Sequence, residues 1–209
     1  MLRRSYLAPR NDTNPMENHT DEQLVESYLN GEKEALELLI KRYLKPIFGF
    51  AFSYTKNSED AEEITQDAFF KAWKNLKKFD KEKKFKTWLF SIAKNTALDF
   101  LKKKKPLLFS TIEEDGKENS IIGKIPEPSP LPDEILNRAD LAEELNLAMD
   151  KLSPKYREVI FLYYKEQFNF REISELLNEP LDTIKSRHRR AIFNLRKILN
   201  APKEETNSY

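Results

Sequence analysis

The chain has 209 residues, a formal net charge of +1, and 34% charged residues. With no cysteine and two histidines, it excludes disulfides and thiolate metal sites and argues against zinc, so we expect no metal and no cofactor. No apolar run approaches the roughly 18 residues of a membrane-spanning helix, and the basic N-terminus lacks a signal peptide's apolar core. The default expectation is therefore a cytoplasmic protein without membrane insertion.

Charge is strongly segregated along the chain. Residues 71–105 hold thirteen lysines against three acids, residues 110–150 hold eleven acids against three bases, and residues 182–197 hold six Lys or Arg against one acid. Two basic blocks around an acidic one are the arrangement expected if two separate surfaces contact phosphate. Lysines that merely solvate helix faces are the alternative, and they explain the segregation poorly.

The first half of the chain has helical patterns throughout. Residues 1–19 are expected to be a disordered leader. Thr20 and Gln23 have the spacing of a capping box and predict a helix start, and a second helix follows Gly31. The buried stripes of these two helices are predicted to hold Leu24, Val25, Tyr28 and Leu29, and then Ala35, Leu38, Leu39, Tyr43 and Leu44.

Two more helices complete the first predicted domain, residues 20–105. The third begins at a cap provided by Asn57 or Ser58 and ends near Leu76. The fourth runs from about residue 86 to residue 104 and stops before Pro106.

The composition changes between residues 106 and 132, where "IPEPSPLP" places four prolines in eight residues. This acidic segment is predicted to be a flexible linker. Helical pattern resumes near Asp133, and a later helix starts with Ser153 as its cap and Pro154 as its first residue. The sequence thus predicts an all-α protein with two small helical domains, the second at 133–200, and a tail at 201–209.

The third helix has two unlike faces. At 100° per residue, its apolar side holds Ala61, Ile64, Ala68, Phe69, Ala72 and Leu76. The opposite side holds Glu63, Gln66, Asp67, Phe70 and Lys74. An exposed Phe among acids and an amide suits a protein-binding patch with an apolar centre and a polar surround. An ordinary solvated face with one stray Phe is the alternative.

Lysines interleave with aromatic residues between positions 74 and 105. Cations follow a phosphate backbone while aromatic faces stack on unpaired bases, so the combination suits single-stranded or opened DNA. Some of these rings must form core. We expect Trp88 and Phe90 to be core, and Phe79 and Phe85, in the loop, to be the better candidates for contact with bases.

The segment from Asn169 to Leu199 contains two helical patterns separated by Pro180, with Asp182 predicted to cap the second. The predicted inward positions of the second helix are Ile184, His188, Ala191, Leu195 and Ile198, and the predicted outward positions are Lys185, Ser186, Arg187, Arg189 and Arg190. This is a helix-turn-helix pattern, whose second helix enters the DNA major groove. His188 is expected to be neutral and partly buried. A plain helical hairpin with a basic face is the alternative.

The order of two motif blocks resembles that of a bacterial RNA polymerase sigma factor of the extracytoplasmic-function (ECF) subfamily. The first block is "DAEEITQDAFFKAW" with "FDKEKKFKTWLFSIAKNTALDFLKKKK", and the second is "LSPKYREVIFLYY" with "FREISELLNEPLDTIKSRHRRAIFNLRKIL". Two independent blocks in the right order make the resemblance specific. It implies that residues 20–105 are sigma region 2 and residues 133–200 are sigma region 4.

The resemblance implies a function without a catalytic residue. A sigma factor binds core RNA polymerase, directs it to promoters and helps to open the minus-ten element, in this subfamily for a stress or envelope response. The implied partners are the clamp helices of the largest polymerase subunit, the flap region, promoter DNA and an anti-sigma factor that the sequence does not identify.

The resemblance also assigns residues to three surfaces. The implied polymerase-binding residues are Glu63, Gln66, Asp67 and Phe70. The implied minus-ten DNA residues are Phe79, Lys84, Phe85, Lys94, Asn95, Asp99 and Lys102. The implied minus-thirty-five DNA residues are Thr183, Lys185, Ser186, Arg187, Arg189 and Arg190. The chain departs from the family at His188 and Arg189, and at Asp182, where glycine is common; these departures concern the promoter sequence.

Two other classes of protein compete with this interpretation. A response-regulator activator also carries a C-terminal helix-turn-helix, but it needs an N-terminal α/β domain, whereas residues 20–105 are helical in pattern throughout. An enzyme would need Glu62, Glu63 and Asp67 to act as a carboxylate cluster. They lie on one helix without a histidine or cysteine partner.

Overall fold

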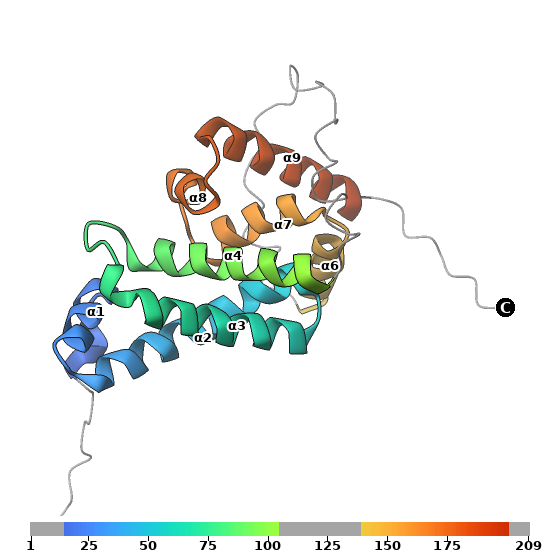
Figure 1. Ribbon diagram of the computed structural model, residues 1–209. Coiled ribbons are helices and arrows are strands. Elements are labelled where there is room, and N and C mark those ends of the chain that lie inside the picture. The colour runs from blue at the N-terminus through green and yellow to red at the C-terminus, as the bar shows by residue number, and fades with distance from the viewer. Residues whose placement is uncertain (1–14, 105–138, 201–209) are drawn as a thin grey trace, which may run out of the picture.

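The computed structural model describes residues 15–104 and 139–200, and the regular elements within them are all helices (Figure 1). The N-terminal half contains α1 (Asp21–Leu29), α2 (Lys33–Thr55), α3 (Ser58–Asn75) and α4 (Phe85–Lys104), with 3₁₀ turns at Pro15–Asn18 and Leu76–Lys78. The C-terminal half contains α6 (Ala139–Asp150), α7 (Pro154–Ile160), a π turn at Phe161–Lys165, α8 (Phe170–Leu177) and α9 (Leu181–Leu199).

The all-α prediction is confirmed. Within the described ranges, no helix is long and apolar enough to cross a membrane. The predicted linker, the tail and nearly all of the predicted leader lie outside the described residues, as does the point near Asp133 where helical pattern was expected to resume.

Helix starts follow the predicted capping chemistry. The Thr20 and Gln23 pair forms a full capping box, with N···O distances of 2.8 and 3.2 Å. The Asn57 side chain accepts a hydrogen bond from the Asp60 amide at 2.9 Å and caps α3. Ser153 occupies the N-cap position of α7 as predicted, but its hydroxyl makes no capping bond. These local interactions fix where the helices begin, because each satisfies amides that lack a partner within the helix.

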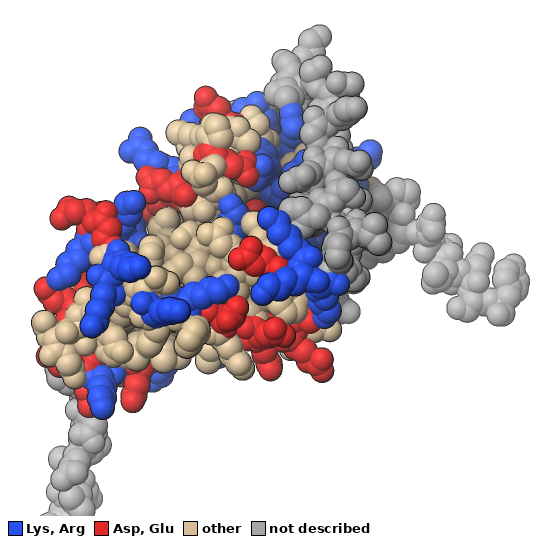
Figure 2. Space-filling view, in the orientation of Figure 1, with Lys and Arg blue, Asp and Glu red and all other residues tan. Residues whose placement is uncertain are grey.

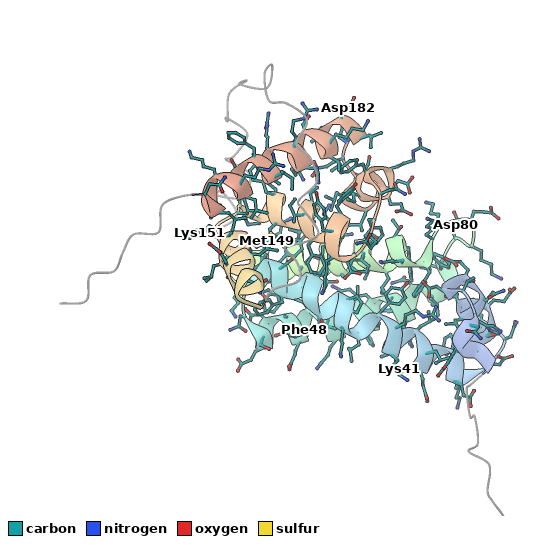
Figure 3. The ribbon with its side chains drawn as sticks, turned by 180° about the vertical axis from the view of Figure 1, so that it is seen from behind. Lys41, Phe48, Asp80, Met149, Lys151 and Asp182 are labelled. Atoms are coloured by element: carbon teal, nitrogen blue, oxygen red, sulfur yellow. The ribbon has the colours of Figure 1, made fainter. Side chains whose placement is uncertain are left out.

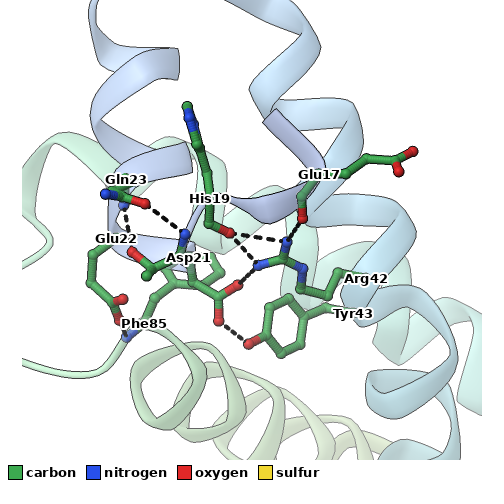
Figure 4. Close-up of polar contacts among 9 residues, drawn as sticks. Glu17, His19, Asp21, Glu22, Gln23, Arg42, Tyr43 and Phe85 are labelled. Atoms are coloured by element: carbon green, nitrogen blue, oxygen red, sulfur yellow. Dashed lines mark hydrogen bonds and ion pairs between the residues drawn. The ribbon is translucent and has the colours of Figure 1, made fainter. Parts of the chain in front are cut away.

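A polar cluster ties the N-terminal turn to α2 and α4 (Figure 4). The Arg42 guanidinium donates to the carbonyl oxygens of Glu17 and His19 at 3.2–3.3 Å and pairs with the Asp21 carboxylate. Asp21 also accepts a hydrogen bond from the Tyr43 hydroxyl, whose pKa is raised, first by burial and then by this carboxylate. In addition, the Glu22 carboxylate accepts the Phe85 amide at the start of α4, at 2.9 Å.

Of the nine predicted core positions of the first two helices, five are buried, Tyr28 and Leu38 are partly buried, and two are exposed. Leu24, Val25, Ala35, Leu39 and Tyr43 are buried, whereas Leu29 and Leu44 are exposed, so their predicted burial is wrong. Leu29 is the last residue of α1, beyond the packed part of the helix. Leu44 is exposed, as is Lys41 about one turn earlier, which Figure 3 shows on the side of α2 away from α8 and α9.

The two halves of the molecule share one apolar core. Helix α2 contacts α1, α3 and α4 in its own half and α7 in the other, while α8 lies against α4. Phe50 of α2 lies 5.8 Å from Phe161, and Phe90 of α4 lies 5.2 Å from Phe168, measured between ring centroids. A smaller cluster of buried residues joins α6, α7 and α9. The helix-turn-helix is therefore packed on the N-terminal half.

Arg157 of α7 is a buried junction between the halves. Its guanidinium donates to the carbonyl oxygens of Met149, Asp150 and Leu152 at 2.9–3.0 Å, and across the interface to that of Ser53 at 2.8 Å. Four carbonyl acceptors satisfy one planar cation, which makes its burial tolerable.

Candidate nucleic-acid interface and protein-docking face

Helices α8 and α9 form the predicted helix-turn-helix. Asn169 and Glu172 make a capping box at the start of α8, with N···O distances of 2.9–3.0 Å. The helix ends at Asn178, which adopts the left-handed conformation with φ of 55°. Asn tolerates this conformation better than most residues, so the chain can turn sharply towards α9.

Helix α9 does not use Asp182 as its cap, so this prediction is wrong. The N-cap is Pro180, with φ of −58°, and the helix begins at Leu181 without a side-chain capping bond. Proline is already restricted to this φ and lacks the amide that would need a partner, which allows the helix to start earlier. Asp182 lies exposed in the first turn, where its negative charge suits the positive end of the helix.

The basic side of α9 faces away from the core, as predicted. Ile184, Ala191 and Leu195 are buried, whereas Thr183 and Lys185 are exposed and Ser186, Arg187, Arg189 and Arg190 are half-buried. Arg187 is held against the turn by the Glu179 carboxylate, with Nη2 and Oε2 2.5 Å apart. Among the described residues, the structure gives no ion pair to Lys185, Arg189 or Arg190, so their charges are available to a ligand.

A surface hollow at the start of α9 adds a residue that the sequence did not indicate. Its lining consists of Lys155 and Tyr156 from α7 and Asp182, Thr183, Ser186, Arg187 and Arg190 from α9. Lys155 is only the second residue of α7, and nothing in its local sequence marks it as a partner of residues about thirty positions later. It joins the basic surface because α7 packs against α9.

His188 lies inside an aromatic cage on the inner side of α9. Its ring centroid is 4.9 Å from that of Tyr163, 5.7 Å from that of Tyr164 and 5.0 Å from that of Phe170. Its Nε2 is buried and has no hydrogen-bond partner among the residues that the structure describes. The side chain is partly buried, as predicted, and burial lowers the pKa of the imidazole, which favours the neutral form.

The predicted docking face of α3 is fully open to solvent. Glu63, Gln66, Asp67 and Phe70 are all exposed, and Phe70 retains 66% of its accessible surface. Figure 2 shows acidic side chains gathered over the N-terminal half of α3 and basic ones over the C-terminal end of α4. An exposed aromatic ring among acids is the pattern predicted for a protein-docking face.

The loop before α4 differs from its prediction. Phe79 is 8% exposed and Phe85 is fully buried, so the prediction that these two rings face unpaired bases is wrong for this structure. They pack with Trp88 into a three-ring cluster, with centroids 5.2–5.7 Å apart. The 3₁₀ turn at Leu76–Lys78 and the bond from the Phe85 amide to Glu22 direct both rings inwards.

The other aromatic predictions for α4 fare better. Phe90 is buried, as predicted, whereas Trp88, also predicted to be core, packs against the core but is only half-buried. Trp88 is therefore the accessible member of the three-ring cluster and a better candidate for stacking on a base than either phenylalanine.

The polar residues predicted to contact minus-ten DNA divide into two groups. Lys84, Asn95, Asp99 and Lys102 are exposed, at the loop and along α4. Lys94 is half-buried, and its ammonium donates to the carbonyl oxygen of Leu177 at the end of α8, at 2.7 Å. No group of three or more potential metal-ligating side chains occurs in the described part of the chain.

Comparisons with known proteins match both halves. The Sigma-70 region 2 model matches residues 39–106, and the Sigma-70 region 4 model matches residues 148–197. The ECF RNA polymerase sigma factor SigW of Bacillus subtilis is 34% identical over 170 residues, which cover 81% of this chain and 91% of SigW. The ECF RNA polymerase sigma-E factor of Haemophilus influenzae is 29% identical over 182 residues, covering 86% of this chain and 93% of that protein.

Two solved structures have a similar fold. The sigma factor RpoE of Bartonella quintana, in complex with the anti-sigma factor NepR, has a TM-score of 0.59 at 24% identity, over 80% of this chain and 98% of that one. CnrH, in complex with the cytosolic domain of CnrY, has a TM-score of 0.60 at 23% identity, over 87% of this chain and 98% of that one.

Proposed function

Because the chain belongs to the ECF RNA polymerase sigma factors, we propose that three of its exposed surfaces divide the work of promoter recognition. One surface docks to core RNA polymerase, and the other two hold DNA at the minus-ten and minus-thirty-five elements. The separation of the acidic-aromatic face of α3 from the basic faces of α4 and α9 supports this division. A basic surface attracts the negatively charged phosphate backbone, whereas an acidic surface repels DNA and is left for a protein partner.

The docking surface consists of Glu63, Gln66, Asp67 and Phe70 on α3. We assign it to the clamp helices of the largest polymerase subunit, and the C-terminal half to the flap region. An exposed ring surrounded by polar groups is the pattern of an interface anchor inside a solvated rim. The structure supports this by leaving all four side chains exposed on one helix.

The minus-ten surface consists of Lys84, Lys94, Asn95, Asp99 and Lys102, with Trp88 in place of the buried phenylalanines as a stacking platform. Cations beside a partly accessible ring favour an unpaired strand over a duplex, because bases in a duplex already stack on each other. Preferential binding of the unpaired strand shifts the equilibrium towards opened DNA without a chemical step.

The minus-thirty-five surface is the outer side of α9, with Thr183, Lys185, Ser186, Arg189 and Arg190 facing the major groove. Arg and Lys read guanine edges there or bind phosphate. We add Lys155, which lines the same hollow as Arg190, as a phosphate contact. Arg187 contributes less to base contact, because Glu179 already binds it.

The chain then acts without catalysing a reaction, while the polymerase makes the RNA. Glu62, Glu63 and Asp67 are exposed on one helix rather than gathered in a buried pocket, so they do not form the acid-base pair of an active site. Two proteins of similar fold were solved in complexes: the sigma factor RpoE with the anti-sigma factor NepR, and CnrH with the cytosolic domain of CnrY. We expect an anti-sigma factor for this chain too, and action in the cytoplasm where the polymerase works.

The exposure of Phe70 among acids is the observation that best supports this proposal, and core binding tests it. We expect Glu63→Lys and Phe70→Ala each to weaken binding to core RNA polymerase at least about tenfold, the range of an interface anchor. Melting temperatures should stay unchanged, because both side chains are exposed. Glu62→Lys makes the same charge change on the neighbouring face of α3 and is the matched control.

Transcription provides the second readout. Holoenzyme reconstituted with the wild-type chain should start RNA from promoters in a genomic DNA library, and the core enzyme alone should not. If both α3 variants bind core polymerase as the wild type does, the docking assignment is wrong. If holoenzyme starts no more RNA than core enzyme on any template, the proposed function is wrong.

A further inference from the structure

The first turn of α1 connects two other helices (Figure 4). Asp21 pairs with Arg42 and accepts a hydrogen bond from the Tyr43 hydroxyl, which fixes the start of α1 on α2. The next residue, Glu22, accepts a hydrogen bond from the Phe85 amide at 2.9 Å, and Phe85 is the first residue of α4. Two adjacent carboxylates of α1 therefore connect the middle of α2 with the N-terminus of α4.

Helix α4 takes the acceptor for its first amide from a distant part of the chain. The Trp88 amide donates to the Lys84 carbonyl oxygen at 3.2 Å, which places Lys84 at the N-cap position. An N-cap residue commonly supplies a side-chain oxygen to the first amides of its helix, but a lysine ammonium has no acceptor. Glu22 supplies this oxygen from α1, and its negative charge suits the positive end of the helix dipole.

The segment between α3 and α4 makes this cap important, because it is strongly basic. Its exposed lysines are Lys77, Lys78, Lys81, Lys83 and Lys84. Two acids, Asp80 and Glu82, stand among them. Positive charges beside the positive end of a helix dipole destabilise the first turn. The carboxylate of Glu22 offsets this effect at the amide where α4 begins.

A second carboxylate of α1 contacts the same segment more weakly. Glu26, one turn after Glu22, pairs with Lys81 at 2.9 Å, and these two side chains are 58% and 59% exposed. An exposed pair of this kind contributes little, because water screens it and the lysine must give up rotamer freedom. Glu22 is half-buried and binds a backbone amide, so we expect it to determine where the start of α4 lies.

The packing around Phe85 links this hydrogen bond to the proposed minus-ten surface. The Phe85 ring lies 5.8 Å from the ring of Tyr43 and 5.7 Å from that of Trp88, measured between centroids. Trp88 follows Phe85 by three residues, so the two side chains share one side of α4. The position of the Trp88 ring therefore depends on a closed first turn of α4.

We propose that Glu22 is a positioning residue for the minus-ten surface. By capping α4, it holds the Trp88 ring and the neighbouring Lys84 in one arrangement before DNA binds. Glu22 contacts no base or phosphate in this role; it lowers the conformational freedom that the unpaired strand would otherwise have to restrict on binding. This inference depends on the proposed role of the α4 face in holding the unpaired strand.

Hydrogen exchange of the full chain tests the structural part of the proposal. Glu22→Ala removes the acceptor, and we expect the Phe85 amide, followed in peptides covering residues 80–90, to exchange at least about tenfold faster. Glu22→Gln keeps an oxygen acceptor and should stay within about twofold of the wild type. Glu26→Ala removes an acid one turn along the same helix, and this matched control should leave the exchange unchanged.

Strand opening by holoenzyme tests the functional part. The template is a promoter that the wild-type holoenzyme transcribes in the genomic library, and permanganate reactivity of unpaired thymines follows its opening. We expect Glu22→Ala to open it about fivefold more slowly, roughly the effect of one lost helix cap, and Glu22→Gln to restore most of the rate. Binding of a duplex fragment that ends upstream of the minus-ten element should not change, because α9 holds that part of the promoter.

If Glu22→Ala does not fold, Glu22→Asp decides, because Asp keeps the charge but its side chain is shorter by one methylene. Glu22→Asp should then show the faster exchange and the slower opening.

Three outcomes would overturn the proposal. The first is unchanged exchange of the Phe85 amide in Glu22→Ala. The second is faster exchange with a normal rate of strand opening, in which case the proposed function survives. The third is an equal loss of binding to the upstream duplex fragment, which would indicate general damage to the fold. A wild-type holoenzyme that opens no promoter in the library would instead contradict the proposed function.

Discussion

The faces of α4 and α9 have similar charge but different surroundings. Lys84, Lys86 and Lys94 around α4 have oxygen ligands from the other half of the molecule. On α9, by contrast, Lys185 and Arg190 have no ion pair within the part of the chain that the structure describes. One basic surface is therefore exposed in the unbound chain, and the other is partly covered.

The two basic surfaces differ because acidic side chains and a helix C-terminus lie next to α4 but not next to most of the basic side of α9. Helix α8 presents Glu172 and its C-terminal carbonyl to α4, whereas the first turn of α9 has only Asp182 and the neighbouring Glu179, which binds Arg187. A run of basic residues thus indicates that a surface can bind phosphate, but packing decides whether it is accessible.

The largest predicted effect concerns Arg157 of α7, the helix that packs against α9. Without it, the position of α9 on the rest of the molecule is no longer fixed. Arg157→Ala leaves four carbonyl oxygens without their donor, and we expect a loss of about 3–5 kcal/mol in the free energy of unfolding. Chemical denaturation of the full chain measures it. Arg171→Ala, on the exposed side of α8, should cost less than about 0.5 kcal/mol. Similar midpoints for the two variants would show that the Arg157 junction contributes little.

The next largest predicted effect compares DNA binding by one variant of the α9 surface with that by one variant of the α4 surface. We expect Arg190→Ala to weaken duplex binding by about 1–3 kcal/mol, both in the isolated chain and in holoenzyme, because its surface is exposed in both. Lys94→Ala should weaken DNA binding in holoenzyme more than in the isolated chain, because Lys94 of the isolated chain donates to the Leu177 carbonyl oxygen. Fluorescence anisotropy with duplex and single-stranded probes measures both variants. Lys197→Ala, at the far end of α9, is the control, and equal losses for Lys94→Ala in both states would contradict the comparison.

The smallest effect concerns the inner side of α9. Burial lowers the pKa of His188, so its contribution to stability is complete above the ordinary histidine pKa of about 6.5 and is lost as the pH falls through the lower folded value. We expect the melting temperature to fall between pH 7.5 and pH 5.5 by a few degrees more in the wild type than in His188→Leu. Glu158 has a raised pKa and titrates in both chains, so the difference between them isolates His188. Parallel pH profiles would exclude a role for its protonation.

Most features that depend on local chemistry were predictable from the sequence, although the predicted cap of α9 at Asp182 was wrong. The capping box at Thr20, the cap at Asn57 and the start of α7 at Pro154 lie where predicted, because each depends on residues within one helical turn. The outward faces of α3 and α9 follow from helical periodicity, since only one side of each helix carries small or aliphatic residues.

Features that depend on distant contacts were not predictable. Phe79 and Phe85 lie in a loop pattern, yet they are buried because they pack with Trp88 and, for Phe85, with Tyr43 of α2. Lys155 joins the basic surface through packing of α7 on α9, and Lys94 is engaged through contact with α8. None of these contacts produces a periodic pattern in the sequence, because the partners are far apart along the chain and meet only in the tertiary fold. The role of each exposed site residue stays a prediction.

The Arg42 cluster has a practical consequence for dissecting the protein. The Sigma-70 region 2 match begins at residue 39, but Arg42 and Tyr43 bind groups between Glu17 and Asp21, upstream of that boundary. A fragment trimmed to the matched segment would also lose the carboxylate that receives the first amide of α4. An N-terminal fragment for expression by itself should therefore start near residue 15. A fragment that starts at residue 39 would lack the residues that hydrogen-bond to Arg42, Tyr43 and Phe85.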